Sequence, residues 1–275
     1  MTEQHSYTGI KAVKFTIPKL QKLKNAGQKF AVLTAYDHSL AAAINNAGTE
    51  VILVGDSLGM TIQGHNSTLP VTLDDMVYHT KNVISGAPNS LIMVDMPFAT
   101  YANITDAVQT AAALMRAGAE IVKLEGRDWI IPIIAKLTEQ GIAACAHFGL
   151  TPQFVHQFGG YKVQGRDKSD AEQMVKNAIA AQEAGAKMIL LECVPTPLAK
   201  QITEAVTIPV IGIGAGKYTD AQVLVIQDIL GLTAQPARFA KNYLEQAGSI
   251  QKAIAAFGTE VRDGSYPQPQ HSFEN

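Results

Sequence analysis

Residues 116–126 read RAGAEIVKLEG, a stretch that combines the end of a helix, a glycine turn and a short apolar strand. Glycine directly after a helix is typical of the left-handed cap position, which other residues adopt at a cost. Lys123 and Glu125 are two positions apart in the strand, so their side chains point to the same face. Two charges on one face of an apolar strand indicate a polar cluster near its end.

The same pattern occurs twice more in the chain. Residues 183–193 read EAGAKMILLEC, and residues 46–57 read NAGTEVILVGDS. Each copy runs from Ala-Gly through an apolar strand to an acid, Glu192 or Asp56, although the last copy is one residue longer. A repeated helix–glycine–strand unit indicates alternating α and β elements around a parallel sheet.

Eight near-continuous apolar runs are the strand candidates, as expected for parallel strands covered on both faces. They are residues 30–34, 51–57, 91–97, 121–126, 143–149, 188–194, 209–215 and 222–228. Helical patterns lie between most of them, at residues 38–47, 73–84, 104–116, 129–140, 171–184 and 198–205. Thr105-Asp106 and Ser169-Asp170 are the predicted N-caps of two of these helices. The 217–221 connection is too short for a full helix.

Eight strands that alternate with helices in 275 residues predict an α/β fold, a single-domain (β/α)₈ TIM barrel. We place the barrel at about residues 28–235, after a helix at 17–25. Extra C-terminal helices, near 237–246 and 249–262, and a polar tail fill residues 236–275. A doubly wound open sheet is the alternative, but no GxGxxG follows the first strand.

Composition excludes several classes of protein. Lys and Arg number 22 against 24 Asp and Glu, a net charge of −2 that offers no basic surface for nucleic acid. The N-terminal sequence lacks the apolar core of a signal peptide, and no apolar run approaches the ~18 residues of a membrane span. Cys145 and Cys193 are predicted to be buried and unpaired in a reducing, cytoplasmic environment.

The C-terminal ends of the strands form the active site of a (β/α)₈ barrel. Five successive predicted strands place polar side chains there: Asp56 and Ser57, Asp95, Lys123 and Glu125, His147, and Glu192. A single acid at a strand end is usually a helix cap or part of a rim ion pair, but five such strands in succession are hard to explain in that way. We therefore predict an active site at this rim, with His147 in the site rather than in the core.

Converging carboxylates would repel one another unless a cation lay among them. Lys123 is one cation, and a hard divalent metal is another, because carboxylate oxygens suit Mg²⁺ better than Zn²⁺. The chain has no HExxH or CxxC motif to support a zinc site. The GIGAG sequence at 212–216 is open to two interpretations, a phosphate cradle or a close approach of backbone. Residues 58–75 and 157–166 are expected to form loops around the rim.

The chain resembles the ketopantoate hydroxymethyltransferase family along most of its length. The matching stretches are LTAYD (33–37), VGDSLGMTIQGHNSTLPVT (54–72), AGAEIVKLEG (117–126), HFGLTPQ (147–153), FGGYKVQGR (158–166), LLECVP (190–195) and PVIGIGAGKYTD (209–220). The resemblance implies a TIM barrel that uses Mg²⁺ and transfers a one-carbon unit from 5,10-methylenetetrahydrofolate to 3-methyl-2-oxobutanoate. The product would be ketopantoate, for pantothenate and coenzyme A biosynthesis, formed through a Mg-stabilised enolate.

The resemblance also implies roles for individual residues. Asp56 and Asp95 would bind the metal, with Glu125 in the same shell or through water. Ser57 and Lys123 would position the 2-oxo acid together with the two aspartates. Glu192 would be the catalytic proton acceptor, and His147 is expected among the substrate-binding residues. A cytoplasmic homodecamer is a further implication.

Two other functions remain open on the residues alone. Another Mg²⁺-dependent barrel acting on 2-oxo acids, a lyase or a mutase, would share the metal-binding acids and need no folate. A non-catalytic barrel that senses an anionic metabolite would bind metal and ligand without proton exchange. Neither alternative predicts a partner other than a small molecule, and none of the three functions requires nucleic acid or a membrane.

Overall fold

The computed structural model of the protein describes residues 14–274. Eight parallel strands close into a barrel in which each strand pairs with its neighbours in the sequence and β8 pairs with β1. The strands are β1 (Phe30–Thr34), β2 (Val51–Val54), β3 (Leu91–Asp95), β4 (Ile121–Glu125), β5 (Ala144–Gly149), β6 (Met188–Glu192), β7 (Val210–Ile213) and β8 (Ala221–Leu224). The predicted (β/α)₈ barrel is confirmed, and each predicted strand overlaps one of these eight, although the predicted strand 222–228 ends at Leu224 and its last residues belong to helix α10 (Ile226–Ile229).

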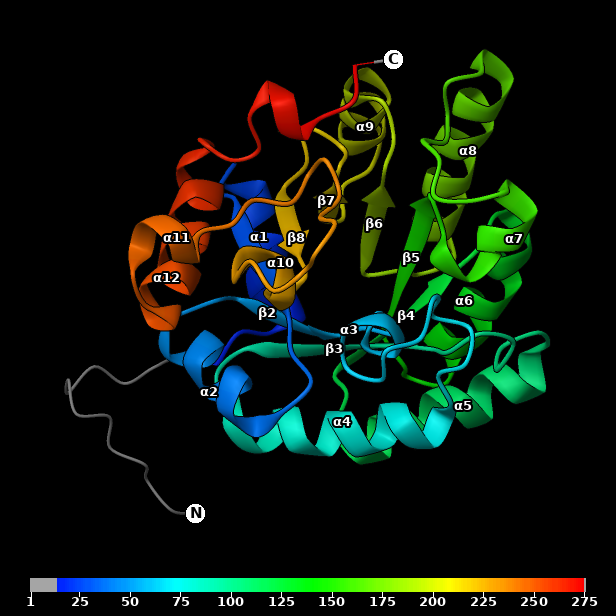
Figure 1. Ribbon diagram of the computed structural model, residues 1–275. Helices are drawn as coiled ribbons and strands as arrows, with labels where there is room; N and C mark the ends of the chain where they lie inside the picture. The colour runs from blue at the N-terminus through cyan, green and yellow to red at the C-terminus, as the bar shows by residue number, and fades with distance from the viewer. Residues whose placement is uncertain (1–13, 275) are drawn as a thin grey trace.

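Helices surround the strands on the outside (Figure 1). They are α1 (Ile17–Asn25), α2 (His38–Asn46), α3 (Leu58–Thr61), α4 (Leu73–Gly86), α5 (Ile104–Ala117), α6 (Ile131–Glu139), α7 (Val155–Phe158), α8 (Lys168–Glu183), α9 (Thr196–Ala205), α10 (Ile226–Ile229), α11 (Leu244–Ala247) and α12 (Ile250–Asp263). Short 3₁₀ turns occupy Asp128–Ile130, Pro152–Phe154 and Pro269–His271. Residues 214–220 join β7 to β8 without a helix, as predicted.

Two terminal helices complete the barrel. Helix α1 lies at the N-terminal end of the strands, where Lys24 pairs with Asp220 at 2.8 Å and Gln21 donates to the Thr207 carbonyl. Helix α12 packs against β1 and α2. The predicted leading helix and the second predicted C-terminal helix are therefore confirmed.

The predicted helix near 237–246 is wrong for most of its length. Only its last residues belong to a helix, α11, and residues 232–243 have no helical structure. Gly231 has a positive φ of 68°, which ends the preceding helical turn. Phe239 and Tyr243 are buried, and the Phe239 carbonyl accepts a hydrogen bond from Tyr266 at 2.6 Å. The segment is held by these buried aromatic contacts rather than by a helical ladder.

Both predicted N-caps are displaced by two residues. Asn103 caps α5 by accepting from the Asp106 amide at 3.0 Å, and Asp167 caps α8 by accepting from the amides of Ser169 and Asp170. Asn and Asp are strong caps, and here they precede the acids that were predicted to cap. Those acids instead lie in the first helical turn, where negative charge is also favourable.

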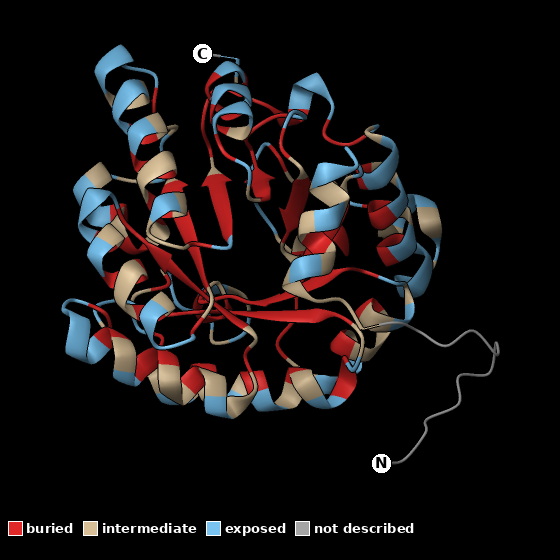
Figure 2. Ribbon diagram, turned by 180° about the vertical axis from the view of Figure 1, so that it is seen from behind, coloured by how far each residue is buried: buried red, intermediate tan, exposed pale blue. Residues whose placement is uncertain are grey.

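The strands are almost entirely buried, whereas the long outer helices turn one face to solvent (Figure 2). Val, Ile, Leu and Ala fill the strand positions, so most of the barrel interior is a packed apolar core. Cys145 and Cys193 are buried and free, as predicted. No helix within residues 14–274 is long and apolar enough to cross a membrane.

The C-terminal tail lies close to the barrel mouth beside α9 (Figure 1). The Phe273 carbonyl accepts hydrogen bonds from the amide and hydroxyl of Thr196, at 2.7 and 3.0 Å. Tyr266 and His271 are buried. The tail, which includes a 3₁₀ turn, is thus docked next to the end of β6.

Candidate active site

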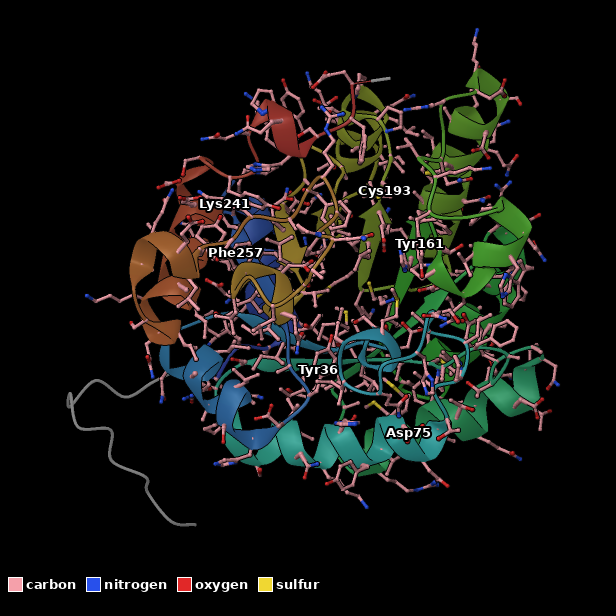
Figure 3. The ribbon with its side chains drawn as sticks, viewed as in Figure 1. Tyr36, Asp75, Tyr161, Cys193, Lys241 and Phe257 are labelled. Carbon is pink, nitrogen blue, oxygen red and sulfur yellow. The ribbon has the colours of Figure 1, made fainter. Side chains whose placement is uncertain are left out.

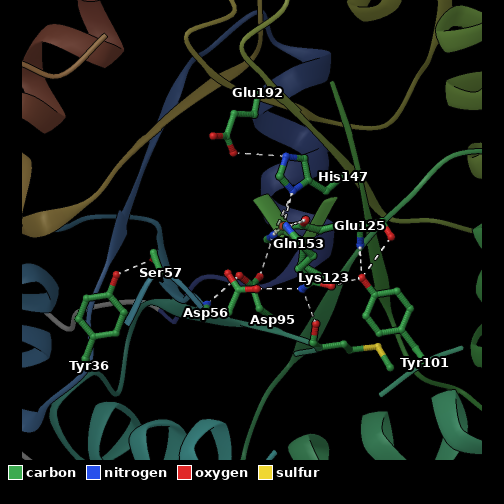
Figure 4. A network of polar contacts seen from close by, with 11 residues as sticks. Tyr36, Asp56, Ser57, Asp95, Tyr101, Lys123, Glu125, His147, Gln153 and Glu192 are labelled. Carbon is green, nitrogen blue, oxygen red and sulfur yellow. Dashed lines mark hydrogen bonds and ion pairs between the residues drawn. The ribbon is translucent and has the colours of Figure 1, made fainter. Parts of the chain in front are cut away.

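Strands β2 to β6 bring all seven predicted site residues to the C-terminal end of the barrel. Asp95, Glu125 and Glu192 are the last residues of their strands, and Asp56 follows β2 after a single glycine. Register places Asp95 beside Lys123 and Glu125 beside His147 on neighbouring strands. Figure 4 shows the resulting network, with His147 between Glu192 and the other charged groups.

Lys123 is the central cation of the cluster. Its Nζ lies 3.0 Å from Asp95 Oδ1, 3.5 Å from Glu125 Oε1 and 3.1 Å from His147 Nδ1. Burial alone would lower the pKa of Lys123, but the neighbouring carboxylates outweigh burial and raise this pKa above its usual value. The lysine therefore remains charged and offsets part of the negative charge at the rim.

Asp56 and Asp95 form a crowded, buried pair. The Asp56 amide donates to Asp95 Oδ2 at 3.0 Å. Burial, followed by the charges of Asp95 and Glu125, raises the pKa of Asp56 well above its usual value. Burial also raises the pKa of Asp95, although Lys123 opposes that shift. A second cation near these two carboxylates would favour their ionised forms.

Glu125 is held by protein groups on both of its oxygens. Oε1 lies 3.2 Å from His147 Nδ1, and Oε2 accepts from the Gln153 amide at 3.1 Å. Burial would raise the pKa of Glu125, but Lys123, His147 and the hydrogen bond from the Gln153 backbone amide together outweigh burial and hold this pKa below its usual value. Burial and Lys123 together lower the pKa of His147, so the imidazole is neutral. The two neutral tautomers of His147 have different partners: a proton on Nδ1 donates to Glu125, whereas a proton on Nε2 points at Glu192.

Glu192 lies across the site from the two aspartates. Its Oε2 is 3.4 Å from His147 Nε2, and 16 % of its side chain is exposed, more than for the other acids of the cluster. Burial, followed by the charge of Glu125, raises the pKa of Glu192 to about 8. A carboxylate whose pKa lies near neutrality and that faces an open mouth is suited to accept and return a proton.

Ser57 lies at the start of α3, immediately after Asp56. Its hydroxyl forms a 2.8 Å hydrogen bond with the Tyr36 hydroxyl. Burial raises the pKa of Tyr36 to about 12, so Tyr36 is a neutral hydrogen-bonding group. This contact orients the Ser57 hydroxyl beside the aspartates.

Gln153 and Tyr101 belong to the network but have no predicted role. The Gln153 side-chain amide donates to Asp56 Oδ2 at 2.8 Å, and its Oε1 accepts from the Tyr101 hydroxyl at 2.5 Å. Both side chains are buried. Gln153 ends the HFGLTPQ stretch just after a predicted strand, and a polar amide at that position was the available signal.

The donor set fits a Mg²⁺ ion that takes part of its coordination from substrate and water. Within residues 14–274, no group of three or more His, Cys, Asp or Glu side chains is arranged to enclose a metal. Mg²⁺ usually binds through one or two carboxylates and keeps several waters or substrate oxygens. Asp56 and Asp95 supply two adjacent carboxylates, whereas both oxygens of Glu125 already contact protein groups.

The glycines of the GIGAG sequence allow close packing. A Cβ on Gly214 would lie 2.8 Å from Phe239, and one on Gly216 would lie 2.5 Å from Thr196. Both glycines have positive φ, which also disfavours other residues. These contacts favour the close-approach interpretation of this sequence over a phosphate cradle.

A cavity of about 720 Å³ lies beside the mouth, between residues 165–171 and the start of α9. Its lining includes Arg166, Pro195, Leu198 and Glu274 and none of the charged cluster. This cavity is therefore separate from the titratable groups. We place the candidate active site at those groups because of their charges and hydrogen bonds, and not because of cavity volume.

Comparison with known proteins identifies the family of the chain. Residues 14–269 match the family model described as ketopantoate hydroxymethyltransferase. The 3-methyl-2-oxobutanoate hydroxymethyltransferase of Shewanella amazonensis is 54 % identical over 261 residues, which cover 94 % of this chain and 99 % of that protein. The protein of the same name from Marinobacter nauticus is 55 % identical over 260 residues, 94 % of this chain and 98 % of that one.

Solved structures with the same fold are more distant in sequence. A phosphonopyruvate hydrolase, solved with oxalate and Mg²⁺, has a TM-score of 0.61 at 12 % identity, with 94 % of this chain and 93 % of that chain covered. A putative phosphonomutase from Burkholderia cenocepacia has a TM-score of 0.60 at 19 % identity, covering 75 % and 90 %. These structures share the barrel fold, whereas the matches over nearly the whole sequence define the family. The chain belongs to the ketopantoate hydroxymethyltransferase family of enzymes.

Proposed function

We propose that the protein transfers a hydroxymethyl group from 5,10-methylenetetrahydrofolate to 3-methyl-2-oxobutanoate, forming ketopantoate for pantothenate and coenzyme A synthesis. Family membership and the names of relatives 54–55 % identical support this reaction. The observation that carries the proposal is one rim that joins a pair of acids, a buried lysine and a separate glutamate of raised pKa. A positioned base and nearby positive charge both accelerate abstraction of a proton next to a keto group.

Asp56 and Asp95 would hold Mg²⁺, with Glu125 acting through water because its own oxygens contact His147 and Gln153. When bound, Mg²⁺ supplies Lewis-acid polarisation of the 2-oxo acid. Lys123 places its charge where negative charge develops on the substrate oxygen. Ser57 and His147 are hydrogen-bonding groups on either side of the aspartates and would orient the acid.

Glu192 would take the single C3 proton of 3-methyl-2-oxobutanoate. The electron pair left on the substrate forms a carbon–carbon bond with the methylene carbon of the folate donor. The methylene carbon exchanges its two carbon–nitrogen bonds for this carbon–carbon bond and a carbon–oxygen bond to water. The C3 proton and one proton of water end on the two folate nitrogens, and tetrahydrofolate leaves. The folate contributes the one-carbon unit, and the protein contributes position and charge.

A D₂O experiment tests this proposal. Protein, Mg²⁺ and 3-methyl-2-oxobutanoate in D₂O should lose the C3 proton signal by NMR, and addition of 5,10-methylenetetrahydrofolate should yield ketopantoate. Exchange without any ketopantoate would favour a lyase or mutase. Binding of metal and acid without exchange would favour a non-catalytic metabolite-binding barrel.

We also propose that the protein is a cytoplasmic homodecamer, as its resemblance to the family implies. Ten chains of 29.4 kDa would have a mass of about 294 kDa. Light scattering after gel filtration should report that mass. A monomer or dimer at micromolar concentration would contradict the decamer and leave the proposed reaction intact.

Lys123→Ala should impair both binding of the 2-oxo acid and turnover. The variant loses the cation that contacts Asp95 and Glu125, so the pKa values of both acids should rise. Loss of one group that stabilises developing charge typically lowers turnover by about 10²–10³-fold. Steady-state kinetics gives KM and kcat, with Lys136→Ala, an exposed lysine of α6, as the control. If neither constant changes, Lys123 has only a structural role.

Gln153→Met should weaken Mg²⁺ binding by about 10–100-fold, the usual cost of losing a partner that orients a metal ligand. Methionine is close in size to glutamine but cannot donate to Asp56 or accept from Tyr101. Competition with Mn²⁺, followed by electron paramagnetic resonance, measures the affinity independently of turnover. Tyr101→Phe should have a smaller effect in the same direction. Unchanged Mn²⁺ and Mg²⁺ affinities would show that Gln153 does not orient the site.

A further inference from the structure

The loop after β5 reaches across the mouth of the barrel. The Tyr161 hydroxyl donates to Met60 Sδ at 3.4 Å, and Met60 lies on α3, which follows β2. Strands β3 and β4 lie between β2 and β5, so this contact spans the strand ends that carry Asp95 and Glu125. Farther along the loop, the Gln164 amide donates to the Cys193 carbonyl at 3.0 Å, directly after Glu192. In the view of Figure 3, Tyr161 is labelled over β5, between β6 and α7.

Tyr161 and Met60 are both exposed. Tyr161 is 51 % exposed and Met60 is 40 % exposed. The one hydrogen-bond partner of the Tyr161 hydroxyl in the described chain is a thioether sulfur, which is a weak acceptor. Burial, followed by the charges of Glu192, Asp56 and Glu125, raises the pKa of Tyr161, as expected for a phenol close to the cluster.

The backbone around Tyr161 is built from glycines in the left-handed region. Gly159 and Gly160, with φ of 64° and 116°, precede Tyr161, and Gly165, with φ of 77°, follows it. A Cβ on Gly160 would meet no atom within 4 Å, so backbone conformation rather than space accounts for glycine there. These conformations bring the tyrosine over the mouth.

Another exposed aromatic residue near the rim has a structural explanation. Trp129 stacks on Tyr101, with ring centroids 5.7 Å apart and planes within 7°, and also contacts Phe154. Its ring is therefore part of a packed aromatic cluster. Among the described aromatic pairs, none includes Tyr161, so its ring has no aromatic neighbour of this kind.

We propose that Tyr161 and Met60 form the surface on which the planar ring system of the one-carbon donor stacks. This inference rests on the proposed function, because it assigns a place to the donor in that reaction. The reactive methylene must approach C3 of the 2-oxo acid near Glu192, and the loop that carries Tyr161 is bonded through Gln164 to Cys193, the residue after Glu192. Aromatic rings stack on tyrosine, and a methionine sulfur contacts ring edges favourably.

Tyr161→Ala tests the proposal, with tetrahydrofolate as the probe and isothermal titration calorimetry on the Mg²⁺-loaded protein as the measurement. The expected result is a Kd for tetrahydrofolate at least tenfold higher, with C3 exchange of 3-methyl-2-oxobutanoate in D₂O unchanged. Tyr161→Phe keeps the ring and should stay within about threefold of the wild-type Kd. Tyr218→Ala is the matched control, because Tyr218 is similarly exposed but lies against Lys200 on the outside of the barrel.

The outcomes separate this inference from the proposed function. If wild-type protein binds tetrahydrofolate and Tyr161→Ala binds it equally well, the stacking surface is wrong and the proposed reaction stands. If Tyr161→Ala loses C3 exchange together with tetrahydrofolate binding, Tyr161 shields the 2-oxo acid instead, which also overturns the inference. Wild-type protein that exchanges C3 without binding tetrahydrofolate would overturn the folate reaction and this inference with it.

Discussion

Glu192→Gln should bind Mg²⁺ and 3-methyl-2-oxobutanoate but lose exchange of the C3 proton in D₂O, with or without folate. Glutamine keeps the shape of glutamate and cannot accept the proton. A positioned general base typically contributes ~10²–10⁴-fold, and the exchange rate should fall by that factor. NMR measures exchange, and the Mn²⁺ competition described above measures metal binding. Glu139→Gln, at an exposed site on α6, is the matched control.

The position of Glu192 explains why its role should be separable from metal binding. A carboxylate that coordinates a metal is a poor base, and Asp56 and Asp95 lie on the far side of His147 from Glu192 (Figure 4). If Glu192→Gln exchanges the C3 proton at the wild-type rate, another group is the base. The neutral His147, 3.4 Å from Glu192, would be the next candidate.

The raised pKa of Glu192 also determines the direction of the pH dependence. Its pKa of about 8 means that the carboxyl is mostly protonated at neutral pH before metal binds. Exchange needs the deprotonated form, so its rate should rise with pH through this range. Mg²⁺ adds positive charge nearby, so the midpoint should lie at or below about 8. An exchange rate that falls as pH rises would contradict this assignment.

The sequence predicts the barrel well because burial on both faces makes each strand a continuous apolar run. Strand β2 shows that the end of an apolar run does not give the exact end of the strand. The predicted strand extends to Ser57, but the ladder ends at Val54, and Asp56 and Ser57 lie beyond it. The polar residues that follow an apolar run lie in the loop at the C-terminal end of the strand. In a (β/α)₈ barrel these loops supply active-site residues.

Contacts between distant segments could not be predicted from local patterns. Gln153 and Asp56 are 97 residues apart, and their hydrogen bond depends on closure of the barrel. The position of Gln153 just after a predicted strand was a signal that it lies at the rim, but no sequence pattern indicates that its partner is Asp56. Long-range contacts also explain residues 232–243. The local sequence pattern predicts a helix over part of this segment, but burial of Phe239 and Tyr243 holds it in an irregular conformation.

Asp95→Asn should remove most activity and raise the Mg²⁺ concentration needed for activity by at least about a hundredfold. Loss of a group that only orients a metal ligand usually weakens metal binding less, by about 10–100-fold. Asparagine is a neutral and weaker ligand for a hard cation. It keeps an oxygen that can accept from the Asp56 amide, so the turn after β2 should be preserved. Activity measured over a range of Mg²⁺ concentrations gives the requirement, with Asp74→Asn on the exposed start of α4 as the control.

The fold should survive Asp95→Asn because the native carboxylate is itself crowded. Burial raises the pKa of Asp95, and the charge of Asp95 helps to raise the pKa of Asp56. Removing that charge relieves repulsion at Asp56, and Lys123 still has Glu125 within 3.5 Å. Thermal unfolding without Mg²⁺ should therefore remain cooperative, whereas stabilisation by added Mg²⁺ should be largely lost, since an ion that binds the folded protein more weakly stabilises it less. A variant that Mg²⁺ stabilises as strongly as wild type would show that Asp95 is not a metal ligand.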